Sequence, residues 1–160
     1  MSGYLVDTNI LVRLFVGRDP LRPAAKAAVS ALRRQATPMS VAPQSLVEFW
    51  AVSTRPFEAN GLGLSTQETA EEVDRLHRTF RVLNDPAGTF RRWRQLVQTH
   101  DVKGRQVYDA RLAALMIESG IDHILTFNVD DFRRYPGITA VSPHSLAAPP
   151  TPTEQGATTK

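Results

Sequence analysis

The sequence predicts an α/β fold in which helices cover a central, mostly parallel sheet of about four to five strands. Short apolar runs alternate with longer segments of helical periodicity, which is the pattern of parallel sheets with helices on both faces. The first apolar run, residues 4–6, is continuous rather than alternating, as expected of a strand buried on both faces. With 160 residues the chain can bury one core, so one domain is expected.

The individual elements follow from local patterns along the chain. Strands are predicted where short apolar or β-branched runs end at polar or turn residues, at 4–6, 39–42, 80–83, 123–126 and 138–141. Helices are predicted where apolar residues recur at three- and four-residue spacing, at 8–16, 24–35, 44–54, 67–79, 89–99 and 106–119, with a short one around 129–134.

Local signals mark where several of these helices begin and end. Pro23 favours the start of the second helix. Ser65 or Thr66 is expected to cap the fourth, and Glu68 is placed to complete a capping box. Gly120 should end the sixth helix as a C-cap. We therefore expect one domain over residues 1–145 and a disordered, proline-containing tail over 146–160.

Composition and charge limit the possible classes of protein. The net charge of +3 favours an anionic partner only weakly, and the arginines near residue 91 are either a solvated helix face or a binding patch. The absence of cysteine excludes disulfides and zinc–thiolate sites and fits a reducing cytoplasm. Neither a signal peptide nor an apolar run of about 20 residues is visible. A cytoplasmic protein without membrane association is therefore expected.

Two aspartates stand at positions that suggest a site. Asp7 follows the first buried strand, at the sheet edge where α/β proteins bind ligands, although it or Thr8 can equally act as the cap of the next helix. Asp109 shares an apolar helix stripe with Leu112 and Met116. A first-turn carboxylate is favoured by the helix dipole, but this does not explain why an acid faces the apolar side.

Two further acids are weaker candidates by position alone. Glu48 lies in a helix among apolar residues, and the commoner outcome for such a residue is exposure beside a basic neighbour, here Arg55. Asp131 stands three residues after Asn128, so the two can form a reciprocal capping pair. Either acid is therefore open to a structural interpretation as well as a functional one.

Convergence of these acids would require a cation. Two carboxylates about 4 Å apart repel by roughly 4 kcal/mol at an effective dielectric near 20, and burial adds to this cost. Oxygen-only donors suit Mg²⁺, for which Mn²⁺ can substitute. The four histidines stand at positions 77, 100, 123 and 144 and do not have the spacing of zinc ligands. A zinc site is therefore not expected.

Four segments of the chain resemble the acidic motifs of PIN-domain nucleases. They are Leu5-Val-Asp-Thr-Asn-Ile-Leu, Ser45-Leu-Val-Glu-Phe, Val107-Tyr-Asp-Ala-Arg-Leu-Ala-Ala and Leu125-Thr-Phe-Asn-Val-Asp-Asp-Phe. The match runs in order over residues 3–142 and is closest to the VapC toxins of bacterial toxin–antitoxin pairs. Together the four segments are specific, although each one alone is weak. The resemblance implies a PIN-like α/β/α sandwich.

The resemblance also implies roles for particular residues. Asp7, Glu48 and Asp109 are the expected metal-binding catalytic acids, with Asp131 as the fourth catalytic acid. The expected polar supports of these acids are Thr8, Asn9, Thr126 and Asn128. PIN sequences often have an aspartate where this chain has Asn128, so the fourth acid is Asp131, Asp130 or absent.

The implied function is Mg²⁺-dependent endoribonuclease activity, in which a metal-bound water attacks the RNA phosphodiester. The family further implies a VapB-like antitoxin and a homodimer. Two alternatives remain open at this point. One is an inactive PIN-like module that binds RNA or protein, against which the intact acids argue. The other is a structure-specific DNA nuclease of related fold, which usually carries DNA-clamping insertions.

Overall fold

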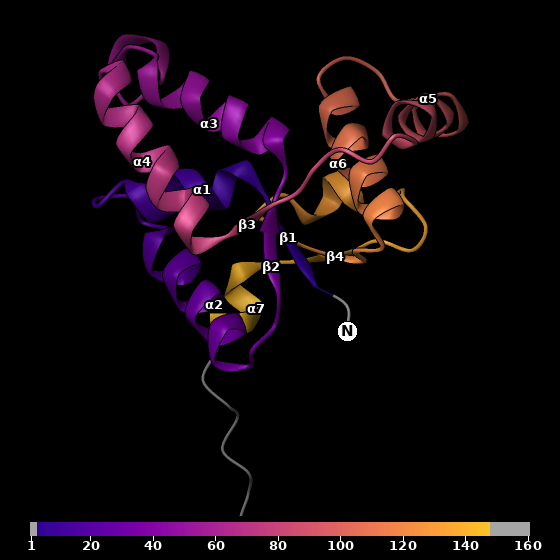
Figure 1. Cartoon of the computed structure of the whole chain (residues 1–160), viewed down its shortest axis with the longest axis horizontal. Helices are drawn as coiled ribbons and strands as arrows, with labels where there is room; N and C mark the ends of the chain where they lie inside the picture. The colour runs from indigo at the N-terminus through magenta and orange to yellow at the C-terminus, as the bar shows by residue number, and fades with distance from the viewer. Residues whose placement is uncertain (1–2, 148–160) are drawn as a thin grey trace, which may run out of the picture.

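The computed structural model describes residues 3–147 and shows helices packed around a central sheet (Figure 1). The strands are β1 (Tyr4–Val6), β2 (Met39–Val41), β3 (Arg81–Val82), β4 (His123–Leu125) and β5 (Thr139–Val141). The helices are α1 (Thr8–Phe15), α2 (Arg22–Arg34), α3 (Pro43–Thr54), α4 (Thr66–Thr79), α5 (Thr89–Thr99), α6 (Gln106–Ser119) and α7 (Pro143–Ala147), with 3₁₀ turns η1 (Phe57–Ala59) and η2 (Val129–Phe132).

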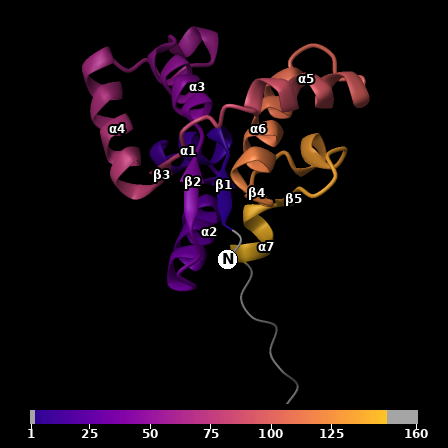
Figure 2. The ribbon, with the colours of Figure 1, turned by 45° about the vertical axis from the view of Figure 1, so that its right-hand side comes forward.

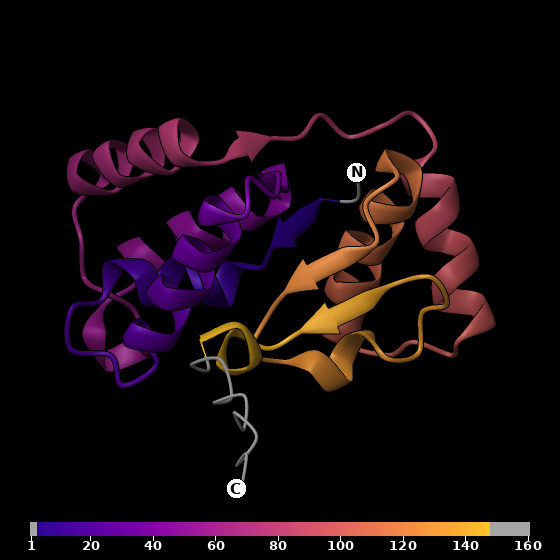
Figure 3. The same ribbon diagram turned by 90° about the horizontal axis from the view of Figure 1, so that it is seen from below.

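The strands within the described residues form one parallel sheet in the order β3-β2-β1-β4-β5. Tyr4 of β1 lies opposite Met39 on one side and His123 on the other, so β1 occupies the centre. Figure 3 shows β4 and β5 running side by side in the same direction. The predicted parallel α/β sheet with helices on both sides is confirmed.

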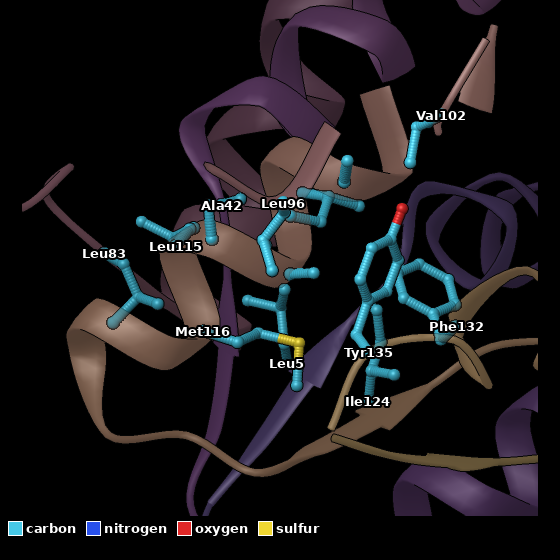
Figure 4. Close-up of a cluster of buried hydrophobic side chains, with 14 residues drawn as sticks. Leu5, Ala42, Leu83, Leu96, Val102, Leu115, Met116, Ile124, Phe132 and Tyr135 are labelled. Atoms are coloured by element: carbon cyan, nitrogen blue, oxygen red, sulfur yellow. The ribbon is translucent and has the colours of Figure 1, made fainter. Parts of the chain in front are cut away.

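Alternating side chains of each strand supply two separate cores. Leu5 and Ile124 face α5 and α6, where they pack with Leu115, Met116 and Tyr135 (Figure 4). On the other face, Val6 and Leu125 pack against α1, α2 and α3. Figure 2 shows α1–α4 on one side of the central strands and α5 and α6 on the other. Burial of β1 on both faces explains its unbroken apolar run.

The local signals for helix ends are confirmed in three cases. Pro23 lies in the first turn of α2, which begins at Arg22. Ser65 and Glu68 form the capping box of α4, with the Glu68 backbone N–H donating to Ser65 Oγ (3.1 Å). Gly120 ends α6 in the left-handed conformation, with φ of 69°. This conformation is one that glycine adopts without steric cost, so glycine suits the position.

Some expectations about the elements are wrong or incomplete. Asn128 precedes η2 without a side-chain capping bond, so the expected capping pair with Asp131 does not form. The short α7 was not expected, and residues 146 and 147, assigned to the disordered tail, complete this helix. Helix α7 packs against α2, a contact that local sequence does not reveal. The rest of the expected tail, residues 148–160, lies outside the described residues.

Candidate active site

The site is built at the carboxyl ends of the central strand β1 and its neighbour β4. The Asp7 backbone N–H donates to the Leu125 carbonyl (3.1 Å), which fixes Asp7 and Thr126 side by side just beyond the sheet. Thr126 Oγ1 donates to Asp7 Oδ2 (2.8 Å). The other carboxylate oxygen, Oδ1, accepts from the Thr8 backbone N–H (2.7 Å). Asp7 is therefore both the cap of α1 and part of a buried cluster at the ligand edge of the sheet.

Polar neighbours hold Thr126 in this orientation. Asn9 Nδ2 donates to Thr126 Oγ1 (3.1 Å), and Asn9 Oδ1 accepts from the Phe127 backbone N–H (3.3 Å). The Asn128 backbone N–H also donates to Thr126 Oγ1 (3.0 Å). Because Oγ1 already accepts two hydrogen bonds, its own proton is directed to Asp7. The residues named as polar supports thus form one network around Asp7, with Asn128 contributing through its backbone.

Glu48 is turned toward this network by contacts from two helices. Its Oε2 accepts from Thr8 Oγ1 (2.8 Å) on α1, and its Oε1 accepts from Gln44 Nε2 (2.8 Å) one turn earlier on α3. The side chain is partly buried. The interpretation of Glu48 as an exposed partner of Arg55 is therefore wrong.

Burial and mutual repulsion raise the proton affinity of two of the acids. Asp7 is only 7% exposed, and its burial raises its pKa to about 6, although hydrogen bonds from Thr126 and Thr8 oppose the rise. The negative charges of Glu48 and Asp131 raise the Asp7 pKa further.

The half-buried Asp109 lies in the first turn of α6, and its pKa rises to about 7. Desolvation is the main cause, followed by the negative charges of Asp7, Asp131 and Glu48, while Arg134 lowers the pKa. The four acids expected from the sequence therefore form one electrostatic cluster. They come from four parts of the chain, namely the end of β1, α3, α6 and η2.

The structure distinguishes the two neighbouring acids of η2. Asp131 is partly buried and acts electrostatically on both Asp7 and Asp109. Asp130 is exposed and forms an ion pair with Arg133 (2.8 Å). Asp131 rather than Asp130 is thus the η2 acid that belongs to the cluster.

The donors of the cluster suit a hard cation, since they are carboxylate oxygens under mutual repulsion. Within residues 3–147, no three His, Cys, Asp or Glu side chains form a set arranged to hold a metal ion directly. Mg²⁺ usually keeps several waters and binds through one or two carboxylates, so such a closed set is not required. The residues present therefore fit a hydrated Mg²⁺ ion better than a cation that needs a complete protein cage.

Two residues beside the cluster were missed as site residues. Gln44 holds Glu48 and also donates to the Tyr108 carbonyl (3.1 Å). Arg111 donates to Gln44 Oε1 (3.2 Å) and to Asp85 Oδ2 (2.9 Å). The four-residue spacing of Gln44 and Glu48 was a usable signal. No local signal exists for Arg111, because its partners are distant in sequence.

Comparisons with known proteins agree with this geometry. The family model of the PIN domain matches residues 4–138. A DNA-bound VapBC from Salmonella typhimurium is similar, at 17% identity and a TM-score of 0.66 over 89% of this chain and 99% of that one. A toxin–antitoxin complex from Klebsiella pneumoniae has 25% identity and a TM-score of 0.59 over 88% and 98%.

A Sarcin-Ricin loop cleaving VapC toxin from Mycobacterium tuberculosis matches with 20% identity and a TM-score of 0.62, over 86% of this chain and 99% of that one. No curated protein matches the sequence. The family match runs from β1 through β4, ends just before β5, and includes all four clustered acids. The chain therefore belongs to the PIN-domain family.

Proposed function

We propose that this protein is a Mg²⁺-dependent endoribonuclease and the toxin of a VapBC-type toxin–antitoxin pair. The observation that carries the proposal is the convergence of Asp7, Glu48, Asp109 and Asp131 at the carboxyl edge of the sheet. Such a cluster is unfavourable for the fold alone, because burial and like charge both oppose ionisation. Raised carboxylate pKa values of this kind gather at functional sites.

In this proposal, Asp7, Glu48 and Asp109 hold the cation, for which Mn²⁺ can substitute. Thr126 and the Thr8 backbone N–H fix both oxygens of Asp7, and Gln44 with Thr8 fixes those of Glu48. Bound there, Mg²⁺ supplies a water of lowered pKa and neutralises charge on the phosphodiester. Asp131 would add a fourth negative charge beside the residues that hold the cation. By analogy with the PIN-domain family, the expected products are a 3′-hydroxyl and a 5′-phosphate.

Similar structures support the proposed partners. VapBC complexes from Rickettsia felis, Salmonella typhimurium and Haemophilus influenzae share the fold, which supports a VapB-like antitoxin for this chain. The Mycobacterium tuberculosis neighbour cleaves the Sarcin-Ricin loop, which supports RNA as the substrate class. A homodimer and a cytoplasmic location complete the proposal. Among residues 3–147, no helix has the length and apolarity to cross a membrane.

A cleavage assay tests the proposal with conservative variants. The purified protein is incubated with single-stranded RNA and with flap DNA, in Mg²⁺, in Mn²⁺ and in EDTA. Asp7→Asn is the preferred variant, because asparagine is also a good N-cap and preserves the start of α1. Asp109→Asn is the second, and Asp130→Asn is the matched control, since this exposed acid pairs with Arg133.

We expect RNA cleavage in Mg²⁺ that is lost in EDTA and in both site variants but kept in Asp130→Asn. Undiminished cleavage in EDTA would rule out the metal mechanism. Cleavage of flap DNA in preference to RNA would indicate the DNA nuclease alternative. RNA binding without turnover in any of these metals would indicate the inactive module.

A further inference from the structure

A small cavity between α5 and α6 is lined by none of the four acids and by none of their direct hydrogen-bond partners. Phe90, Trp93 and Arg111 line this cavity, which we call the aromatic pocket, and its volume is about 270 Å³. Phe90 is 71% exposed, and Tyr108 at the start of α6 is 58% exposed. An exposed ring that lines a cavity, as Phe90 does, suggests binding rather than packing.

A hydrogen bond fixes Trp93 of the aromatic pocket in the absence of any ligand. The Trp93 indole N–H donates to the Val107 carbonyl at the start of α6 (2.9 Å). Phe90 lies beside Trp93, with ring centroids 5.7 Å apart and planes tilted by 35°. Since the polar group of Trp93 is already satisfied within the protein, a ligand meets mainly the faces and edges of the rings.

Arg111 connects the aromatic pocket to the acidic cluster. Its guanidinium group donates to Asp85 and to Gln44 Oε1, and the same Gln44 amide donates to Glu48 Oε1 (2.8 Å). One glutamine side chain thus separates the pocket from a proposed metal ligand. The aromatic pocket and the acidic cluster are thus joined by a continuous chain of hydrogen bonds through Arg111 and Gln44.

We propose that the aromatic pocket binds one unpaired nucleobase next to the scissile phosphate of the RNA substrate. The inference deepens the proposed ribonuclease function and rests on it. Bases of single-stranded RNA are recognised by stacking on aromatic rings and on arginine guanidinium planes. The volume of about 270 Å³ lies below the range of about 300–1,000 Å³ typical of drug-sized ligands, which suits a single flat base.

The charge around the aromatic pocket favours a nucleic acid over an apolar partner surface. Arg94 is exposed and lies one helical turn after Phe90 on the same face of α5. Arg91, on the same helix, is also exposed. Proteins that bind single strands combine stacking rings with nearby cations that follow the phosphates. Phe90 with Arg94 reproduces this combination on one helix.

The test compares substitutions of Phe90 with a matched control elsewhere. Phe57 is 73% exposed in η1, so Phe57→Ala removes an equally exposed ring outside the aromatic pocket. Steady-state cleavage of a mixed-sequence single-stranded RNA is measured in Mg²⁺. We expect Phe90→Ala to raise KM about 5- to 150-fold, the loss typical of one stacked base. Phe90→Leu should behave like Phe90→Ala, Phe90→Trp should restore KM, and Phe57→Ala should change nothing.

A second readout reports on the aromatic pocket without cleavage. The chain has two tryptophans, so Trp50→Phe leaves Trp93 as the only one. We expect its fluorescence to be quenched by single-stranded RNA in EDTA, but much less by an abasic oligonucleotide of the same length. Quenching by single-stranded RNA in EDTA, together with an absence of RNA cleavage in Mg²⁺, would support base binding and refute the ribonuclease function.

Two results would overturn base binding while leaving the ribonuclease function intact. One is identical KM values for Phe90→Ala and Phe57→Ala. The other is a Phe90→Ala protein with an altered oligomeric state, measured by light scattering, and unchanged RNA kinetics. The second result would assign the aromatic pocket to contact with another copy of the chain.

Discussion

Replacing Asp7 with asparagine should stabilise the protein in the absence of divalent cations, although it removes a proposed catalytic group. The pKa of Asp7 rises from 3.8 to about 6, mainly through burial. Since each tenfold change in proton affinity corresponds to about 1.4 kcal/mol, ionised Asp7 costs the fold about 3 kcal/mol at neutral pH. The asparagine side chain would keep the acceptor for the Thr8 N–H but lose the one that faces Thr126, at a cost of about 1 kcal/mol.

The expected net gain for Asp7→Asn is therefore about 2 kcal/mol at pH 7.5, or about 4–8 °C in Tm for a domain of this size. The folded protein holds the Asp7 proton more tightly than the unfolded chain does. The contribution of Asp7 to stability accordingly falls as pH rises from about 4 to about 6. Below about pH 4, Asp7 of the wild type is protonated in both the folded and the unfolded protein, so only the lost acceptor remains and the variant should be about 1 kcal/mol less stable than wild type.

Thermal unfolding followed by circular dichroism between pH 4 and pH 8, with EDTA present, measures this difference. Asp101→Asn is the control, because Asp101 is exposed, has a left-handed backbone that asparagine also tolerates, and is not part of the cluster. A variant that is less stable than wild type at pH 7.5, or a difference that does not change with pH, would refute the argument from burial.

Other predictions follow from the same contacts. Asp131→Asn should lower the RNA cleavage rate at least about 10-fold, and Asp130→Asn should leave it unchanged. Single-turnover kinetics measure both rates. Equal effects of the two substitutions would contradict the different placement of Asp131 and Asp130. Gln44→Ala should lower kcat for RNA cleavage, because Glu48 loses the hydrogen bond that holds it. Gln44→Glu should lower kcat further, because it adds a negative charge beside Glu48. An unchanged kcat in both variants would show that Gln44 is not part of the site. Leu115→Ala should lower the free energy of unfolding, measured in urea, by about 2–5 kcal/mol, because the side chain is fully buried. A loss below about 1 kcal/mol would contradict tight packing around α6.

Much of the fold could be predicted because its signals are local. The capping box at Ser65, the left-handed Gly120 and the unbroken apolar run of β1 each depend on a few neighbouring residues. The expectation for Asn128 was wrong because its backbone N–H donates to Thr126 Oγ1, and Thr126 is held by Asn9, which is distant in sequence. Helix α7 was missed because it depends on packing against α2.

The site could be predicted only in part for the same reason. The positions of Asp7 after a buried strand and Asp109 on an apolar stripe were informative alone. The orientation of Glu48 depends on Thr8, and that of Arg111 on Gln44 and Asp85, all distant in sequence. Only the fold brings these partners together, so the family resemblance was needed to include Glu48 and Asp131.

A Mg²⁺ titration of single-stranded RNA cleavage examines the proposed role of the acidic cluster most directly. The rate is measured from zero to saturating Mg²⁺ for wild type and Asp109→Asn, after removal of metal with EDTA. We predict that the wild-type rate rises from the background to a plateau, and that Asp109→Asn stays near the background throughout. Equal rates for the two proteins, or full wild-type cleavage without Mg²⁺, would contradict metal-dependent catalysis by this cluster.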